Sequence, residues 1–235
     1  MRLDWPNCLN ARDLGGLPTG DGRRIRSGAL IRTDRLSELT PAGVQLVRDH
    51  GVSRIIDLRT IGEVEESPGP FAGDPILRHV SFIDETVTDS IDGETLIEVY
   101  RQSLERNGRS IAAAFDAMVS APPGGVLVHC HAGKDRTGVL VALALQVSGV
   151  PDDEIVADYA LSGDFLRAVH EAYLATLTDE QERTWADDMR GCRAETMADL
   201  LSYLDDRHGG ARSYLSSIGV GDDSLAALRR RLVEE

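Results

Sequence analysis

The chain has 235 residues, 42% of them hydrophobic, which predicts a single domain large enough to bury one core. Its formal net charge of −14 argues against a broad nucleic-acid-binding surface and against general adhesion to anionic membranes. Three irregularly spaced cysteines do not suit a disulfide framework, and neither a signal peptide nor a membrane-spanning run is evident, so we expect a cytoplasmic protein.

The N-terminal third of the chain alternates strand and helix patterns. Residues 23–33 follow a turn-rich stretch and predict a hairpin or a strand that enters a sheet. Thr40 is an N-cap residue in front of a proline, which predicts a short helix over 41–49. An apolar, β-branched run then predicts a buried strand that ends at Asp57.

The middle of the chain continues this alternation. Residues 78–84 predict a second strand, a long helix is expected from about Glu94 to Val119, and residues 126–130 predict a third strand. A helix that is apolar on nearly every side follows from Arg136. The order of these elements predicts an α/β fold with a central, largely parallel sheet flanked by helices on both faces.

The C-terminal part of the chain is helical in pattern and rich in acidic residues, without a further strand. Residues 151–190 predict a helical lobe that packs on the sheet and partly covers its site. Ordinary helical packing around the core explains the same pattern equally well. Both interpretations keep residues 1–235 in one domain.

The stretch HCHAGKDRTG, residues 129–138, points most directly to function. Cys130 ends a predicted strand and Arg136 begins a helix, so the intervening loop lies at the sheet edge where open α/β proteins bind ligands. Backbone N–H groups of this loop and the helix N-terminus can hold a phosphate-sized dianion and favour the thiolate form of Cys130. The arginine offers a planar fork to two phosphate oxygens, and Thr137 offers a hydroxyl to the sulfur. The predicted phosphate-binding residues are His131, Ala132, Gly133, Lys134, Asp135, Arg136 and Thr137.

A metal site is a weaker interpretation of the His-Cys-His sequence. Adjacent residues on a strand point to opposite faces, so His129 and Cys130 are poorly placed to bind one ion, and the sequence contains no second cluster of ligands. We therefore expect neither a metal nor another cofactor.

The motif resembles the phosphate-binding signature of cysteine-dependent phosphatases, and its Gly-Lys-Asp-Arg-Thr form is similar to that of the bacterial tyrosine/serine phosphatase family, which includes phosphoinositide phosphatases. The stretches NARDLGGLPTGDGRRIRSGALIRTDRLSELT, GVSRIIDLRT and MADLLSYLDDRHGGARSYLSSIGV extend the resemblance over nearly the full chain. The resemblance implies the phosphatase fold, with Cys130 as nucleophile and Arg136 as phosphate clamp. It also implies that Lys134 and Asp135 lie near the substrate and that a lid follows Pro151.

The expected activity is metal-independent hydrolysis of phosphomonoesters through a phosphocysteine intermediate. The substrates would be proteins carrying phosphotyrosine, with phosphoserine or phosphothreonine as further options, or phosphoinositides. One alternative is a catalytically silent phosphate-binding module. Another is a different thiolate chemistry, such as arsenate reduction or sulfur transfer, in which Cys8 or Cys192 would serve as resolving thiol; otherwise these two cysteines are bystanders.

Three aspartates are candidates for the general acid that protonates the leaving group. The Trp-Pro pair of this chain is followed by Asn7, so the Trp-Pro-Asp loop of the better-known tyrosine phosphatases is absent. Asp135 is our first choice because it is tethered beside the bound phosphate. Asp84 and Asp57, at the ends of predicted strands, are the others, and an ion pair that orients the arginine or its loop fits Asp57 at least as well.

Lys134 is the single lysine of the chain, since the other twenty-four basic residues are arginines. A compact ammonium beside the site would suit a second phosphate or a carboxylate on the substrate. The alternative is a loop cation that faces solvent.

Overall fold

The computed structural model describes residues 1–84, 86, 93 and 95–235. Within these residues, five strands form one sheet with the order β1-β2-β5-β3-β4. The strands are β1 (Arg12–Asp13), β2 (Leu30–Thr33), β3 (Val52–Asp57), β4 (Leu77–His79) and β5 (Gly125–His129). Every neighbouring pair is parallel except β1 with β2, which is antiparallel. The predicted α/β fold with a largely parallel sheet is therefore confirmed.

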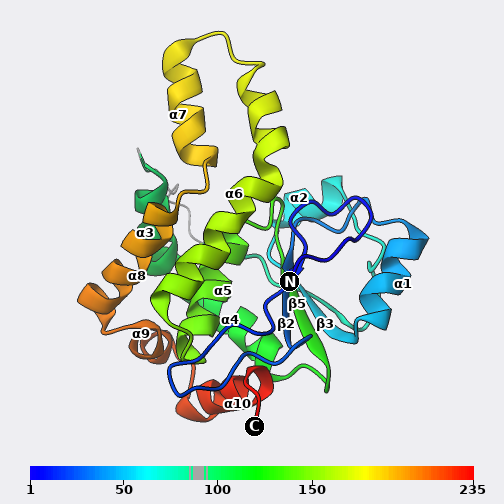
Figure 1. Cartoon of the computed structure of the whole chain (residues 1–235), viewed down its shortest axis with the longest axis vertical. Coiled ribbons are helices and arrows are strands. Elements are labelled where there is room, and N and C mark those ends of the chain that lie inside the picture. The colour runs from blue at the N-terminus through cyan, green and yellow to red at the C-terminus, as the bar shows by residue number, and fades with distance from the viewer. Residues whose placement is uncertain (85, 87–92, 94) are drawn as a thin grey trace.

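Helices surround this sheet and continue beyond it at the C-terminal side of the chain (Figure 1). The described helices are α1 (Pro41–Asp49), α2 (Ile61–Glu66), α3 (Leu96–Arg106), α4 (Gly108–Val119), α5 (Asp135–Val147), α6 (Asp152–Leu174), α7 (Glu180–Arg190), α8 (Ala194–His208), α9 (Ala211–Ser217) and α10 (Asp222–Leu232). None of them is long and apolar enough to cross a membrane.

The sheet separates two hydrophobic layers because successive side chains of a strand point to opposite faces. Ile31, Ile55 and Leu127 belong to the smaller layer, which the N-terminal segment and Val47 of α1 complete. Their strand neighbours, among them Val126 of β5, belong to the larger layer beneath the other helices.

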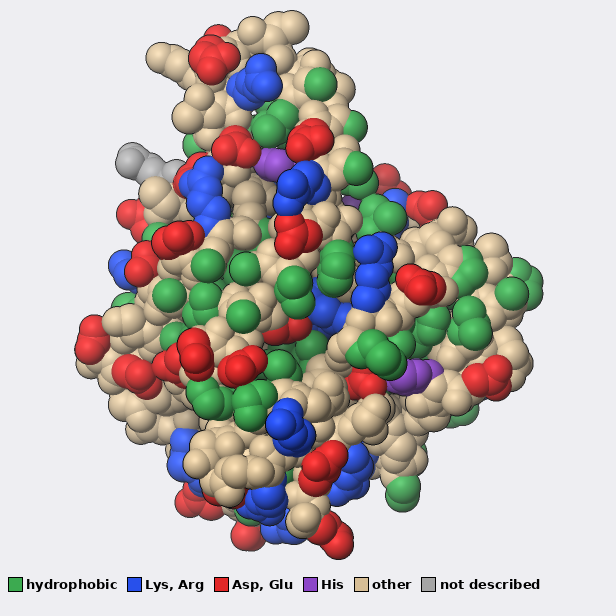
Figure 2. Space-filling view, viewed as in Figure 1, with side chains coloured by type: hydrophobic (Ala, Val, Ile, Leu, Met, Phe, Trp, Pro, Cys, Tyr) green, Lys and Arg blue, Asp and Glu red, His purple; other side chains and the backbone are tan. Residues whose placement is uncertain are grey.

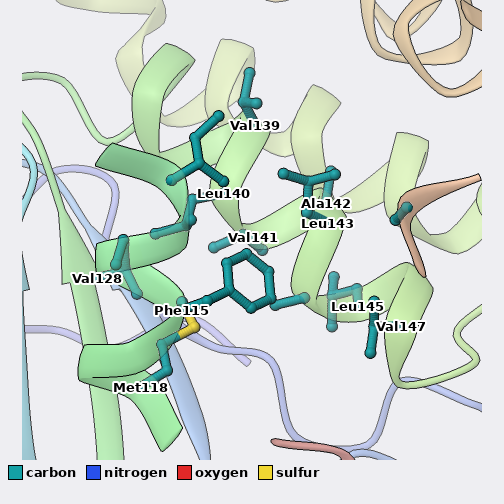
Figure 3. Packing of buried hydrophobic residues seen from close by; sticks show 14 of the residues in the cluster. Phe115, Met118, Val128, Val139, Leu140, Val141, Ala142, Leu143, Leu145 and Val147 are labelled. Carbon is teal, nitrogen blue, oxygen red and sulfur yellow. The ribbon is translucent and has the colours of Figure 1, made fainter. Parts of the chain in front are cut away.

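Helix α5 lies at the centre of the larger layer and is buried on nearly every side, as its sequence predicts. Figure 3 shows its apolar side chains around Phe115 and Met118 of α4, next to Val128 of β5. Because this helix begins with Asp135 directly after the loop at the end of β5, tight packing of α5 also fixes the loop.

Three boundaries differ from the sequence prediction. The hairpin or strand predicted over 23–33 contains only β2 as a strand, while Arg24 makes an isolated antiparallel bridge to Pro18 and Ile25 one to Val233. The strand predicted over 78–84 shortens to the three residues of β4, at the edge of the sheet. The single helix predicted to Val119 is two helices, and its predicted start at Glu94 lies outside the described residues.

The break between α3 and α4 occurs at Asn107, which is buried. Its side-chain oxygen accepts a hydrogen bond from the backbone N–H of Asp84 at 3.0 Å. The asparagine therefore attaches the helix junction to the segment after β4, a tertiary contact that helical periodicity does not reveal.

Helices α6 and α7 cover most of the segment 151–190. The start of α6 packs on α5 and α8, whereas its end and α7 project away from the body as a pair, at the top of Figure 1. Figure 2 shows the molecule from the same side as Figure 1. On this face, Lys and Arg side chains are interspersed with Asp and Glu, so positive charge does not gather there in one broad patch.

Candidate active site

Cys130 lies at the carboxyl end of β5 and is only 2% exposed, at the base of a cavity of about 360 Å³. The loop 130–134 connects it to α5. Helix α2 and the two projecting helices form the remaining walls. The residues that line the cavity with Cys130 are Glu63, His131, Ala132, Lys134, Asp135, Arg136, Leu166, Val169, His170, Met189 and Arg190.

The carbonyl oxygens of residues 131–134 all accept hydrogen bonds from groups outside the loop. The donors are the backbone N–H of Arg35, the side-chain amide of Asn10 and the guanidinium of Arg32, at 2.7–3.3 Å. In the part of the chain that the structure describes, no backbone N–H of residues 131–136 donates a hydrogen bond. Donors that serve no protein acceptor, at the start of a helix, make an anion-binding loop.

Glycine is required at position 133 for two reasons. Its φ of +67° lies in the left-handed region, and a Cβ there would lie 2.2 Å from the carbonyl oxygen of Thr33. The close approach of the loop to the end of β2 therefore excludes any side chain at Gly133.

A buried ion-pair cluster supports the loop from behind. Asp158 of α6 binds Arg12 at 2.7 Å and Arg32 at 2.8 Å. Burial would raise the pKa of this aspartate, but the two guanidinium groups hold the pKa below its usual range. Since Arg32 also donates to the loop carbonyl of Gly133, the cluster joins α6 to the loop 130–134.

Arg136 pairs with a carboxylate that the sequence analysis did not single out. Its two terminal nitrogens donate to Glu63 of α2 at 2.5 and 2.8 Å. The same carboxylate accepts from the backbone N–H and the hydroxyl of Thr60, which closes a capping box at the start of α2. Hydrogen bonds from Arg136 lower the pKa of Glu63 to about 2, so Glu63 is ionised at neutral pH.

This end-on pairing leaves the other edge of the guanidinium available. The described hydrogen bonds of Arg136 do not use its Nε. A guanidinium has five N–H donors, and the pair with Glu63 occupies two of them. Arg136 can therefore bind two phosphate oxygens through its Nε side while Glu63 fixes its orientation.

Asp135 is in the same cavity, and its side chain is 39% exposed. Its Oδ1 accepts a hydrogen bond from the hydroxyl of Tyr100 at 2.6 Å and lies 3.1 Å from the ammonium of Lys134. The Tyr100 hydroxyl in turn lies 2.7 Å from that of Tyr159. Asp135 is thus both fixed from behind and open toward the cavity that holds Cys130.

Lys134 is 4% exposed, so it is not the solvent-facing cation that one interpretation of the sequence suggests. Its ammonium donates to the carbonyl oxygen of Gly191 at 2.6 Å and to that of Met189 at 3.4 Å. Cations are stabilised at a helix C-terminus, where α7 ends. The charge of Lys134 is therefore used largely within the protein.

The other two candidate acids lie outside the cavity of Cys130. Asp57 is buried and binds Arg59 through both carboxylate oxygens, at 2.6–3.1 Å. Burial would raise its pKa, but the hydrogen bonds from Arg59 hold it below the usual range. The carboxylate of Asp84 accepts hydrogen bonds from Thr86, which lower its pKa. Asp57 thus has the ion-pair geometry that one interpretation expects, with Arg59 as partner rather than Arg136.

Two further residues of the motif are buried behind the cysteine. His129 faces Asp57, with Nε2 3.8 Å from the carboxylate, and does not line the cavity. The hydroxyl of Thr137 is buried and has no hydrogen-bond partner among the described residues. The bond between Thr137 and the sulfur that we expect from sequence is therefore not formed in this structure.

Neither of the other cysteines lines the cavity of Cys130. Burial, together with the nearby Asp34, raises the pKa of the Cys8 thiol to about 12. Burial also raises the pKa of Cys192, whose thiol donates to the carbonyl oxygen of Tyr159 at 3.0 Å. Such thiols are poor nucleophiles at neutral pH, which disfavours a resolving role.

Sequence inspection missed Glu63, Tyr100 and Asn10. A signal exists for Glu63, because a threonine followed three residues later by a glutamate, directly after a strand pattern, is the signature of a capping box. For Tyr100 and Asn10 the sequence contains no comparable signal, since their partners depend on how α3 and the N-terminal segment pack.

Comparison with known proteins identifies the family of the chain. A model of the tyrosine phosphatase family matches residues 3–234. A tyrosine-protein phosphatase of Nostoc commune is 34% identical over 228 residues, which cover 88% of this chain and 75% of the relative. The triple specificity protein phosphatase PtpB of Mycobacterium tuberculosis is 30% identical over an alignment 271 residues long, and this alignment covers 96% of this chain and 97% of the relative. The chain therefore belongs to the tyrosine phosphatase family and is a tyrosine-phosphatase-like enzyme.

Proposed function

We propose that the protein hydrolyses phosphomonoesters through a phosphocysteine intermediate on Cys130. The observation that supports this most directly is the loop around the cysteine. Its carbonyl oxygens at 131–134 accept from protein donors, while its N–H groups have no acceptor among the described residues. With the Nε side of Arg136, these N–H groups would bind the equatorial oxygens of a phosphoryl group above the sulfur.

In the first step, the Cys130 thiolate attacks phosphorus. The S–P bond forms as the bond between phosphorus and the leaving oxygen breaks, and Asp135 gives its proton to that oxygen. Asp135 and Glu63 are the carboxyl groups that line the cavity in the described structure, and Glu63 is ionised and paired with Arg136. This leaves Asp135 as the general acid that we propose.

In the second step, the Asp135 carboxylate takes a proton from water, and the water oxygen bonds to phosphorus. The S–P bond breaks, inorganic phosphate leaves, and the Cys130 thiolate and the protonated Asp135 are restored. We propose that the buried hydroxyl of Thr137, which has no partner among the described residues, donates to the departing sulfur.

We propose phosphotyrosine in proteins as the main substrate. The outer wall of the cavity carries the apolar side chains of Leu166, Val169 and Met189, which suit an aromatic ring. Lys134 is engaged by carbonyl oxygens, which weakens the idea that it reads a second phosphate. The relative named a triple specificity protein phosphatase supports acceptance of phosphoserine and phosphothreonine as well.

Phosphoinositides are the second candidate substrate, and Arg190 is the observation that favours them. This exposed arginine of α7 lines the cavity, and its guanidinium carbon lies 3.6 Å from the ring centroid of Tyr173. No ion pair of Arg190 occurs in the described part of the chain, so it could meet a further phosphate. Phosphopeptides and phosphoinositides assayed side by side distinguish the two candidates.

Residues 151–190 would then act as the lid. Side chains of both α6 and α7 line the cavity, and the bond between Lys134 and Gly191 attaches the end of α7 to the loop. A substrate must pass these helices to reach Cys130, so we propose that they limit access to the cysteine within the single domain 1–235.

The direct test of the mechanism uses Cys130→Ser. We expect no turnover of an aryl phosphate but detectable binding of inorganic phosphate, because a serine hydroxyl is not ionised at neutral pH. Cys192→Ser is the matched control and should retain turnover. With 2,4-dinitrophenyl phosphate, whose leaving group needs no proton, Asp135→Asn should still form the intermediate but hydrolyse it slowly, so mass spectrometry after a rapid acid quench should detect phosphate on Cys130.

Two outcomes would replace the proposal. Phosphate binding by the wild-type protein without turnover of any phosphoester would identify a silent binding module. Arsenate reduction or sulfur transfer that depends on Cys8 or Cys192 would identify another thiolate chemistry. Loss of turnover with EDTA, restored by a divalent cation, would contradict the metal-independent mechanism.

A further inference from the structure

Two buried tyrosines form a chain of hydroxyl groups that ends on Asp135. Tyr100 of α3 is 2% exposed and Tyr159 of α6 is 1% exposed. Their hydroxyl oxygens lie 2.7 Å apart, and their rings pack edge to face with centroids 6.3 Å apart. The Tyr100 hydroxyl lies 2.6 Å from Oδ1 of Asp135. Three helices, α3, α5 and α6, thus meet at one carboxyl group.

The direction of the hydrogen bonds in this chain can be derived. A tyrosine hydroxyl has one proton, and an ionised carboxylate can only accept. Tyr100 therefore donates to Asp135, and Tyr159 must donate to Tyr100. Burial, and next the nearby Asp135, raise the pKa of Tyr100 well above its usual value, so Tyr100 remains a donor throughout the neutral range.

The two oxygens of Asp135 consequently have different surroundings. Oδ1 accepts from Tyr100 and lies 3.1 Å from the ammonium of Lys134, whereas no described hydrogen bond uses Oδ2. A proton on the carboxyl group is then retained on Oδ2, because Oδ1 is occupied by donors. The side chain is partly exposed and lines both the cavity of Cys130 and a second cavity beside α3, so we assign Oδ2, the oxygen without a described partner, to the leaving group.

We propose that Tyr100 is a positioning residue for the general acid, fixed in turn by Tyr159, and that it directs the proton of Asp135 to Oδ2. The inference rests on the proposed function, in which Asp135 protonates the leaving oxygen. Tyr100 does not line the cavity of Cys130, so it would act through Asp135. Its hydroxyl also stabilises the carboxylate that remains after the proton has left.

The test is Tyr100→Phe, which removes the hydroxyl and keeps the ring. The second-order constant kcat/KM reports the steps up to phosphorylation of Cys130, so it isolates proton donation. We expect kcat/KM for phenyl phosphate, a poor leaving group, to fall roughly tenfold, while that for 2,4-dinitrophenyl phosphate falls much less. The changed ratio of the two constants is the predicted signature.

The pH profile provides a second readout. A purely structural role for Tyr100 would leave the basic limb of kcat/KM where it is in the wild type, whereas a role through Asp135 should displace that limb in Tyr100→Phe. Apart from Lys134, the charged or titratable groups that line the cavity with Asp135 are Glu63, Cys130, His131, Arg136, His170 and Arg190. All of them remain in the variant, so a displaced limb can be assigned to the lost hydroxyl.

Tyr214→Phe is the matched control. Tyr214 is also 2% exposed, and its hydroxyl donates to the carbonyl oxygen of Leu104 at 2.7 Å, outside the cavity of Cys130. The control should lower the melting temperature without changing the ratio or the pH limb. Tyr159→Phe should shift the ratio in the same direction as Tyr100→Phe but less, and it provides a second variant should Tyr100→Phe fold poorly.

The possible failures are distinguishable. No turnover of either aryl phosphate by the wild-type enzyme would overturn the proposed function. A leaving-group effect in Asp135→Asn combined with equal losses on both substrates in Tyr100→Phe and in Tyr159→Phe would overturn the positioning role alone. The same ratio change in Tyr214→Phe would also overturn it, because any lost buried hydroxyl would then suffice.

Discussion

The ammonium of Lys134 lies 2.6 Å from the carbonyl oxygen of Gly191, so the loop 130–134 is hydrogen-bonded to the residue that follows α7. The same ammonium lies 3.1 Å from Asp135. One buried side chain thus connects the outer wall of the cavity to the proposed acid. Lysine suits this place because its compact charge can serve several oxygens that are not coplanar.

For Lys134→Ala, we predict that kcat/KM falls by a similar factor, roughly tenfold, for an aryl phosphate and for a phosphoinositide. The variant loses the hydrogen bond that attaches the end of α7 to the loop, and it loses the ammonium beside Asp135. Hydrolysis of either substrate needs both interactions. Limited proteolysis should also cut more rapidly near α7. Arg193→Ala, which removes exposed ion pairs to Asp187 and Asp188 at the same helix, is the control with little expected effect on kcat/KM. A loss confined to the phosphoinositide would instead show that Lys134 reads a second phosphate.

Glu63→Gln should weaken the orientation of Arg136. Glutamine keeps the shape of the side chain but offers one acceptor and no charge to the guanidinium, so we expect kcat/KM to fall by roughly 10- to 100-fold. Glu65→Gln, an exposed position of the same helix, is the matched control. An unchanged kcat/KM in Glu63→Gln would mean that the phosphate alone suffices to orient Arg136.

The same pair predicts how stability depends on pH. Hydrogen bonds from Arg136 lower the pKa of Glu63 from about 4.5 to about 2. A lowered pKa in the folded state contributes stability that is fully present above about pH 4.5 and is lost as the pH falls toward 2. The difference in melting temperature between wild type and Glu63→Gln should therefore be constant near neutrality and shrink through this acidic window. A difference that persists unchanged at pH 2 would contradict the assignment.

Asp57→Asn should mainly affect stability. The carboxylate forms a buried pair with Arg59, and removal of one partner leaves an uncompensated charge, which typically costs about 3 kcal/mol. Chemical denaturation would measure this loss. We expect kcat/KM to change by the same factor for phenyl and dinitrophenyl phosphates.

Asp84→Asn should cost less stability than Asp57→Asn, because the carboxylate of Asp84 binds only the neighbouring Thr86 among the described residues. A leaving-group effect in either variant would transfer the acid role from Asp135.

Gly133→Ala should abolish phosphate binding while the protein stays folded. An alanine would be strained at a φ of +67°, and its Cβ would meet the carbonyl oxygen of Thr33, so the loop must deform. Calorimetric titration with inorganic phosphate measures the loss. Gly62→Ala is the control, because a Cβ on this helical glycine would have no atom within 4 Å. Normal phosphate binding by Gly133→Ala would mean that the loop tolerates the displacement.

The parts of the site that sequence inspection predicted are those formed by adjacent residues. Cys130, Asp135 and Arg136 belong to one strand, loop and helix, whose order alone brings them together. Glu63 lies 73 positions from Arg136, and Tyr100 lies 35 positions from Asp135, so tertiary packing decides their contacts. A local pattern could mark Glu63 as a helix cap, but it could not name the arginine as its second partner.

The fold shows the same division between local and distant causes. Buried strands such as β3 and β5 and the apolar helix α5 follow from composition and periodicity. The helix break at Asn107 coincides with the Asn107-Gly108 pair, a local breaker signal that the prediction of one long helix did not use, and the asparagine also accepts a hydrogen bond from the segment after β4, 23 positions away. Edge strands such as β1 and β4 are too short to show a clear alternation of apolar and polar residues. They form because they pair with the neighbouring strands β2 and β3.

The cluster of Arg12, Arg32 and Asp158 has a consequence for folding. Its ion pairs connect residues 126 and 146 positions apart, so the cluster is complete only when α6 has docked against the N-terminal part of the sheet. Until Asp158 has docked, Arg32 lacks the partner that fixes it against the loop carbonyls. An intermediate with a complete sheet but a detached α6 would therefore bind phosphate poorly. Inorganic phosphate would then bind the fully assembled chain selectively and slow its unfolding. The change in unfolding rate with phosphate concentration would measure how tightly α6 is coupled to the sheet.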